Sequence, residues 1–187
     1  MIDLTSIQQK LSKKLDEKRY THTIGVMYTA ASLAMRYNES IETAMTAGLL
    51  HDCGKFPSID KQIQLCEKYH LQLTDAELQV PALIHAKLGS VLAKEVYGIH
   101  DKRILDAILY HTTGKPNMNL LEKIIYLADY IEPGRRMIPG LPEVRTLSFT
   151  NIDEAVCLCS SLTLQYLDRA GRAIDPMTRQ TYEFYLR

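Results

Sequence analysis

The chain has 187 residues, 46% of them hydrophobic and 24% charged, which is the composition of an ordinary globular protein with one sizeable core. Its 22 basic and 22 acidic side chains cancel, which excludes the strong positive field of a typical nucleic-acid-binding protein. No apolar run is long enough to span a bilayer and no signal-peptide pattern is visible, so we expect a cytoplasmic protein without a membrane partner.

Hydrophobic residues recur at helical spacing along nearly the whole chain, and no alternating pattern typical of a strand persists. Two predicted helices open with the capping-box patterns Thr74-x-x-Glu77 and Asn119-x-x-Glu122, and Pro81 interrupts or restarts the first of them. The helices are predicted over residues 4–15, 19–37, 43–51, 60–70, 74–98, 101–111, 120–131, 150–171 and 175–186.

The proline and glycine content of residues 135–148 predicts an irregular loop with a short helical turn around residues 143–147. Such a loop could serve as a lid or wall over a site, or as a passive connector. No linker divides the remaining sequence, so we expect one all-α domain over residues 1–187, in which the helices within residues 150–187 complete the core.

Histidines and aspartates stand on the apolar faces or at the ends of several predicted helices, namely His22, His51, Asp52, His85, His111 and Asp129. A buried carboxylate without a partner is strongly unfavourable, so a set of such residues in a mere core would be unusual. A shared metal ion would supply the missing positive charge, and imidazole nitrogens and carboxylate oxygens are ligands that transition metals accept. The set therefore predicts a metal centre, although any one of these histidines alone would be an ordinary core residue.

The order of these residues and the sequence motifs around them resemble those of the HD-domain superfamily of metal-dependent phosphohydrolases. The metal motif lies within residues 19–135. Four sequence motifs resemble the YqeK-type branch of that superfamily. They are RYTHTIGV at residues 19–26, LLHDCGK at 49–55, HTTG at 111–114 and ADYIEPGR at 128–135. The resemblance implies a helical bundle of the HD type that hydrolyses diadenosine tetraphosphate symmetrically to two ADP and contains two iron ions.

The same resemblance implies roles for the candidate ligands. His22, His51, Asp52 and Asp129 would hold one metal, and Asp52 would bridge it to a second metal held by His85 and His111. A hydroxide shared by the two metals would attack an inner phosphorus, with Asp52 and Lys55 as catalytic residues. Some two-metal relatives carry a second histidine where this chain has Thr112, so the second metal has one protein ligand fewer. Iron is expected, and manganese, cobalt, nickel or zinc would also suit an all-nitrogen and oxygen site.

Substrate contacts are expected from charged and small residues near these ligands. Lys55 and Arg135 would bind phosphate oxygens, and Gly25 would permit close approach of a nucleotide, although Lys55 could instead stabilise a helix end and Gly25 could serve helix packing. Arg136 and Arg145 are less favoured alternatives to Arg135. The full predicted set is Arg19, His22, Gly25, Asp52, Lys55, His85, Thr112, Asp129, Arg135, Gly171, Arg172 and Ile174.

Other functions stay open from the sequence. The metal site could act on a nucleotide monophosphate or a cyclic nucleotide, or it could belong to a nucleotide-sensing module with weak catalysis. A helical interaction protein with a structural metal is a further alternative. The sequence leaves open the metal in the cell, the preference for adenine or guanine, the occupancy of the second metal site and whether the chain forms a homodimer.

Overall fold

The computed structural model describes residues 3–186, and every regular element in that range is a helix. The predicted all-α class is therefore confirmed. None of the described helices is long and apolar enough to cross a membrane. The elements are α1 Leu4–Lys14, α2 Glu17–Tyr37, α3 Ile41–Leu50, α4 Ile59–Lys68, α5 Asp75–Gln79, the 3₁₀-helix η1 Pro81–Leu83, α6 Ile84–Glu95, α7 Lys102–Tyr110, α8 Leu120–Ile131, α9 Leu141–Thr150, α10 Ile152–Arg169 and α11 Pro176–Tyr185.

Side chains at the helix starts explain where most elements begin. Asp16, Ser40 and Asp101 each accept a hydrogen bond from a backbone N–H in the first turn of the helix that follows. Both predicted capping boxes are present, at the starts of α5 and α8. The predicted helix over residues 74–98 is divided at Pro81 into α5, η1 and α6. A proline donates no backbone hydrogen bond, so it ends one helix and suits the first turn of the next.

One prediction is wrong over residues 135–148. Residues 141–150 form α9, a helix of ten residues, where the sequence was expected to give a loop with a short turn. Gly140 precedes α9 with a φ of 82°, a conformation that glycine adopts easily, and Pro142 lies in its first turn, where a missing N–H is tolerated. The irregular segment between α8 and α9 therefore covers only residues 132–140.

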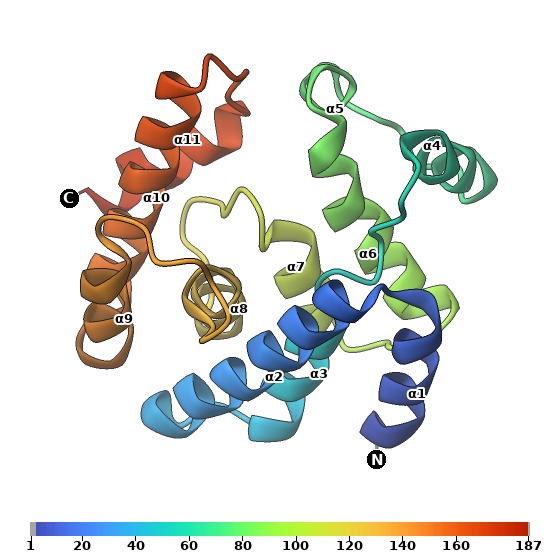
Figure 1. Cartoon of the computed structure of the whole chain (residues 1–187), viewed down its shortest axis with the longest axis horizontal. Helices are drawn as coiled ribbons and strands as arrows, with labels where there is room; N and C mark the ends of the chain where they lie inside the picture. Colours follow the sequence, from blue (N-terminus) through green and yellow to red (C-terminus); the bar gives the residue numbers. More distant parts are fainter. Residues whose placement is uncertain (1–2, 187) are drawn as a thin grey trace.

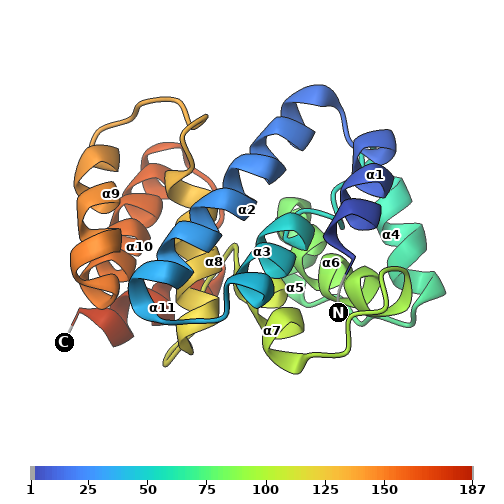
Figure 2. The ribbon, with the colours of Figure 1, turned by 90° about the horizontal axis from the view of Figure 1, so that it is seen from below.

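The helices form a central group with one group on each side of it (Figure 1). α2 packs along α3, and α8 lies against both α2 and α7. α9, α10 and α11 lie together beyond α8, whereas α1, α4, α5 and α6 lie on the opposite side, as Figure 2 also shows. The candidate metal-ligating residues all come from α2, α6, α8 and the ends of α3 and α7, so the central helices and α6 position them.

A close crossing at Gly54 brings the end of α3 against α6. A Cβ atom at Gly54 would lie 2.2 Å from the backbone oxygen of His85 and 2.5 Å from the backbone nitrogen of Gly89. Such distances are possible only without a side chain, so no larger residue fits here unless the backbone moves. The glycine thereby allows the His51-Asp52 pair to approach the helix that carries His85.

Candidate metal centre

The six candidate ligands converge although they are spread over more than a hundred residues of sequence. His22 lies on α2, His51 and Asp52 directly follow α3, and His85 is the second residue of α6. His111 follows α7, and Asp129 is in the last turns of α8. Four of the six, His51, Asp52, His85 and His111, are buried, and the side chains of His22 and Asp129 are 11% and 21% exposed.

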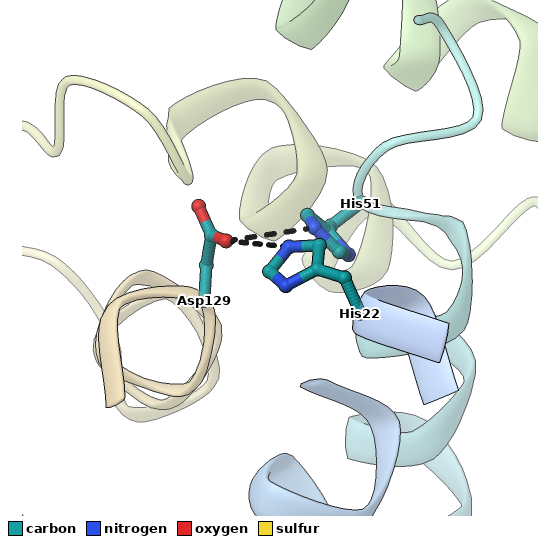
Figure 3. A group of neighbouring side chains, drawn as sticks. All are labelled: His22, His51 and Asp129. Carbon is teal, nitrogen blue, oxygen red and sulfur yellow. Dashed lines mark ion pairs between the residues drawn. The ribbon is translucent and has the colours of Figure 1, made fainter. Parts of the chain in front are cut away.

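One group of side chains gathers around Asp129. Its Oδ1 lies 3.0 Å from Nε2 of His22 and 3.8 Å from Nε2 of His51, as the dashed lines in Figure 3 show. The three ligand atoms all lie within 4.8 Å of one another. Oδ2 of Asp52 is 3.5 Å from the same nitrogen of His51 and 4.0 Å from that of His22. Oxygens of both carboxylates therefore lie within 4.0 Å of the Nε2 atoms of His22 and His51.

A second group gathers at the other oxygen of Asp52. Its Oδ1 lies 3.4 Å from Nε2 of His85 and 3.6 Å from Nε2 of His111, and these two nitrogens are 3.1 Å apart. The hydroxyl of Thr112 lies 3.3 and 3.1 Å from the same two nitrogens. The two oxygens of the Asp52 carboxylate thus face two different groups of ligand atoms, which is the arrangement of a bridging carboxylate.

The facing atoms lack the partners that buried polar atoms normally have. Nε2 of His22, Nε2 of His51 and Oδ1 of Asp52 are buried and make no hydrogen bond with the described residues. They lie within ion-pairing distance of other members of the cluster, and Oδ1 of Asp52 also lies 3.0 Å from Nζ of Lys55. Buried polar atoms are nearly always satisfied by a partner. A cation held between them would satisfy all three, so the residues present fit a metal ion.

In three of the four histidines, the Nδ1 atom that points away from the cluster lies against a backbone carbonyl oxygen. Nδ1 of His51 lies 2.7 Å from the carbonyl oxygen of Gly48, and Nδ1 of His111 lies 2.7 Å from that of Ile108. Nδ1 of His85 lies 2.5 Å from the carbonyl oxygen of Ala82. A carbonyl oxygen only accepts, so Nδ1 must donate, and in a neutral ring the lone pair then sits on the Nε2 that faces the cluster. Each of these three rings is oriented and protonated as a metal ligand requires.

The protonation states also suit metal binding. Burial alone would raise the pKa of the Asp52 carboxyl, but His51, His111 and Lys55 together hold that pKa well below its usual value. The pKa of Asp129 is likewise lowered, because the neighbouring His22, His51 and Arg135 together outweigh the effect of burial. Burial, helped by the charge of Lys55, lowers the pKa of His85 to about 3. The cluster therefore offers carboxylates that are ionised and a histidine that is neutral near pH 7.

Three of the predicted cationic residues lie at the edge of the cluster. Arg19 donates to Oδ2 of Asp52 at 2.8 Å, and Nζ of Lys55 lies 3.0 Å from the same carboxylate. Arg135 is paired with the carboxylate of Asp129 and also donates to its backbone oxygen at 2.7 Å. These side chains are each about a third exposed, so they connect the buried carboxylates to the surface.

Hollows open on more than one side of the cluster. One of about 710 Å³ is lined by Arg19, His22, Arg135 and Arg136 among others. A second, of about 310 Å³, is lined by Arg19, Lys55 and His85. The third, of about 330 Å³, is lined by Lys87, Thr112, Asp175 and Met177. The first two meet at Arg19, and both border residues of the metal cluster.

Four other predicted nucleotide contacts have different surroundings. A Cβ atom at Gly25 would lie 2.6 Å from Oε2 of Glu132, so this glycine makes room for a buried carboxylate, which accounts for it without a nucleotide. Gly171 is exposed with a φ of 59°, and the guanidinium of Arg172 lies 5.7 Å from the centre of the Tyr166 ring. Ile174 is half-buried and directly precedes Asp175, which lines the third hollow.

Sequence reasoning missed Glu132. This residue is 3% exposed, and its Oε1 lies 3.0 Å from Nδ1 of His22. In the sequence it lies in the motif ADYIEPGR, directly after the predicted helix over residues 120–131, and no role was predicted for it. Its partner is 110 residues away, so no local spacing could have revealed the contact.

The chain is similar to known proteins over most of its length. The model of the HD domain family matches residues 19–134. A Bacillus subtilis (strain 168) protein named symmetrical bis(5'-nucleosyl)-tetraphosphatase is 42% identical over 93% of this chain and 92% of its own length. A Staphylococcus aureus (strain NCTC 8325 / PS 47) protein of the same name is 34% identical over 98% of this chain and 95% of its own. The crystal structure of a predicted HD superfamily hydrolase involved in NAD metabolism from Clostridium acetobutylicum superposes with a TM-score of 0.94 at 40% identity, covering 100% of this chain and 98% of that one.

Proposed function

The chain belongs to the HD domain family, and from this premise we propose that it is a metal-dependent hydrolase that cleaves diadenosine tetraphosphate symmetrically into two ADP. The observation that carries the proposal is the Asp52 carboxylate, whose two oxygens face two separate groups of imidazole nitrogens. The substrate is inferred from the relatives named symmetrical bis(5'-nucleosyl)-tetraphosphatase, which match this chain over nearly its full length.

The proposed ligands divide between two metal positions. His22, His51, Asp129 and Oδ2 of Asp52 would hold one metal, and His85, His111 and Oδ1 of Asp52 would hold the other. Because every donor is a nitrogen or an oxygen, iron suits the site, and manganese, cobalt, nickel or zinc would also be accepted. When bound, such a pair of metals supplies an activated water and neutralises charge on a phosphate.

The cationic side chains would position the polyphosphate. Arg19 and Lys55 border the hollow of about 310 Å³, whereas Arg135 and Arg136 line the hollow of about 710 Å³. Guanidinium groups bind phosphate oxygens through paired hydrogen bonds, and a lysine acts as a mobile point charge. Cleavage in the middle of the chain requires room for a nucleoside diphosphate on each side of the reacting phosphorus, and the two hollows offer that room.

The chemical step is hydrolysis of a phosphoanhydride. Water adds to one inner phosphorus, and the bond from that phosphorus to the oxygen between the two inner phosphorus atoms breaks. One ADP leaves with that oxygen, and the other ADP carries the oxygen from water. Lys55 would stabilise the negative charge that develops on the phosphate oxygens during this step. We keep Gly171, Arg172 and Ile174 as proposed contacts for a nucleoside. In the sequence they come just before Asp175 and Met177, which line the hollow of about 330 Å³.

A product assay tests the function. The protein is incubated with diadenosine tetraphosphate and Fe²⁺, Mn²⁺ or Co²⁺, and the nucleotides are separated by ion-exchange chromatography. ADP as the only product supports symmetrical cleavage, whereas AMP with ATP refutes it. His111→Ala should abolish turnover, and His100→Ala, which changes an exposed histidine, is the matched control. Turnover of only a monophosphate or a cyclic nucleotide would point to a different substrate, and tight nucleotide binding without turnover would favour a sensing module.

A further inference from the structure

Glu132 is an acidic side chain buried next to the metal cluster without being one of its ligands. It directly follows α8 and is 3% exposed. Its Oε1 lies 3.0 Å from Nδ1 of His22, and its Oε2 accepts a hydrogen bond from the backbone nitrogen of Gly134 at 2.6 Å. Burying a carboxylate is unfavourable unless its oxygens are paired, and both oxygens of Glu132 are paired.

His22 differs from the other three histidines in its second partner. The Nδ1 atoms of His51, His85 and His111 each face a backbone carbonyl three residues earlier, within the final turn of a helix or in η1. Carbonyls at the end of a helix are free to accept. His22 lies inside α2, where the backbone carbonyls are used by the helix, so its Nδ1 needs a partner from another part of the chain. Glu132 supplies that partner, from a segment 110 residues away.

The surroundings hold Glu132 in this position. A Cβ atom at Gly25 would lie 2.6 Å from Oε2 of Glu132, and one at Gly134 would lie 3.0 Å from it, so both glycines leave the space that the carboxylate fills. The guanidinium of Arg145 donates to the backbone oxygens of Ile131 and Glu132, each at 2.9 Å. The end of α8, which also carries Asp129, is thereby fixed against α2.

We propose that Glu132 is a positioning residue for metal binding, which fixes His22 with its proton on Nδ1 and its Nε2 lone pair directed at the metal position beside Asp129. Carboxylates that bind the far nitrogen of a metal-ligating histidine orient the ring and make it a stronger ligand. The inference rests on the metal centre of the proposed function. Glu132 would affect only the metal position beside Asp129, because at the other metal position His85 and His111 are oriented by backbone carbonyls.

Glu132→Gln tests the role of the carboxylate at nearly unchanged size. Both partners of the Glu132 oxygens are hydrogen-bond donors, Nδ1–H of His22 and N–H of Gly134, and the amide of glutamine offers only one accepting oxygen. Where the amide nitrogen faces His22, the ring must accept at Nδ1 and carry its proton on Nε2, which blocks that nitrogen as a ligand. Gly25→Ala is the second variant, since it displaces the Glu132 carboxylate without removing its charge.

Glu122→Gln is the matched control. Glu122 lies in the first turn of the same helix, is also buried, and pairs with Lys115 and the N-terminus of α8 rather than with a histidine of the cluster. It reports the effect of losing a buried carboxylate from α8 without touching the metal site.

Two measurements decide the inference. ¹⁵N NMR of the metal-free proteins gives the tautomer of His22, and calorimetric titration with Mn²⁺ gives the affinity and the number of sites. We expect His22 to carry its proton on Nδ1 in the wild-type and Glu122→Gln proteins, and on Nε2 in a substantial fraction of Glu132→Gln. Mn²⁺ affinity at one of the two sites should fall about 10- to 100-fold in Glu132→Gln and in Gly25→Ala, and stay unchanged in Glu122→Gln.

The contrary results are equally clear. An unchanged tautomer together with unchanged Mn²⁺ affinity in Glu132→Gln would overturn the inference, and so would an equal loss of affinity in Glu122→Gln. A wild-type protein that bound no Mn²⁺, Fe²⁺ or Co²⁺ would contradict the proposed metal centre instead. The tautomer of His22 in the metal-free proteins would still test whether Glu132 sets it.

Discussion

Replacing Asp52 by asparagine removes the proposed bridge at almost constant size. The carboxylate is buried, lies within 3.0 Å of the cationic groups of Arg19 and Lys55, and has four imidazole Nε2 atoms within 4.0 Å. Removing one partner from a buried set of charges typically weakens the interaction by about 3–5 kcal/mol. If that loss applies to the metals and the transition state, kcat/KM should fall by about 10²- to 10⁴-fold. The fold should persist, because asparagine also avoids the unfavourable burial of a charge.

The assay compares the metal content and the kcat/KM of Asp52→Asn with those of the wild-type protein, using Mn²⁺ and diadenosine tetraphosphate. Thermal unfolding in the presence of EDTA checks that the metal-free fold is intact. Asp153→Asn is the control, because Asp153 pairs with Lys123 at an exposed site, where such a change shifts stability by no more than about 0.5 kcal/mol. Retention of two metals and of activity within tenfold of wild type in Asp52→Asn would refute the bridging role.

Three further outcomes are expected. Gly54→Ala should lower the free energy of unfolding in urea by about 3 kcal/mol or more, because the new Cβ atom would lie 2.2 Å from a backbone oxygen of α6; a loss below about 1 kcal/mol would contradict this packing. Because the folded protein holds the pKa of His85 at about 3, below its ordinary 6.5, the unfolded chain binds the extra proton between these values. Urea titrations of metal-free protein should therefore show stability falling as the pH is lowered from about 6.5 towards 3, and His85→Asn should make that dependence shallower. Removal of metal with EDTA should abolish turnover and lower the melting temperature, and added Mn²⁺ should restore both; turnover that survives chelation would contradict a metal-dependent reaction.

Local signals in the sequence predicted most of the fold. The helices begin and end within a few residues of the predicted bounds, because capping side chains such as Asn119 and helix-stopping residues act within one turn. The helix α9 was missed, since Gly140 and Pro142 were read as loop residues. In the structure they form the entry and the first turn of that helix, the position in which proline is favoured.

The candidate metal site could be predicted as a set of residues but not as a geometry. Histidines on apolar helix faces are visible in the sequence, and their order led to the resemblance that implies how they divide between two metals. The contact between Glu132 and His22 and the pairing of Arg19 with Asp52 depend on how distant helices cross, and no local pattern encodes them. Gly25 illustrates the difference, because the sequence suggested space for a nucleotide and the structure fills that space with the side chain of Glu132.

Anomalous X-ray diffraction from crystals loaded with Mn²⁺, recorded on both sides of the manganese absorption edge, tests the central claim most directly. The account predicts two metal peaks on opposite sides of the Asp52 carboxylate, one beside His22, His51 and Asp129 and the other beside His85 and His111. Such a pair would lie about 3.5–4 Å apart. A single peak, or peaks that do not share Asp52, would contradict a two-metal centre bridged by this residue.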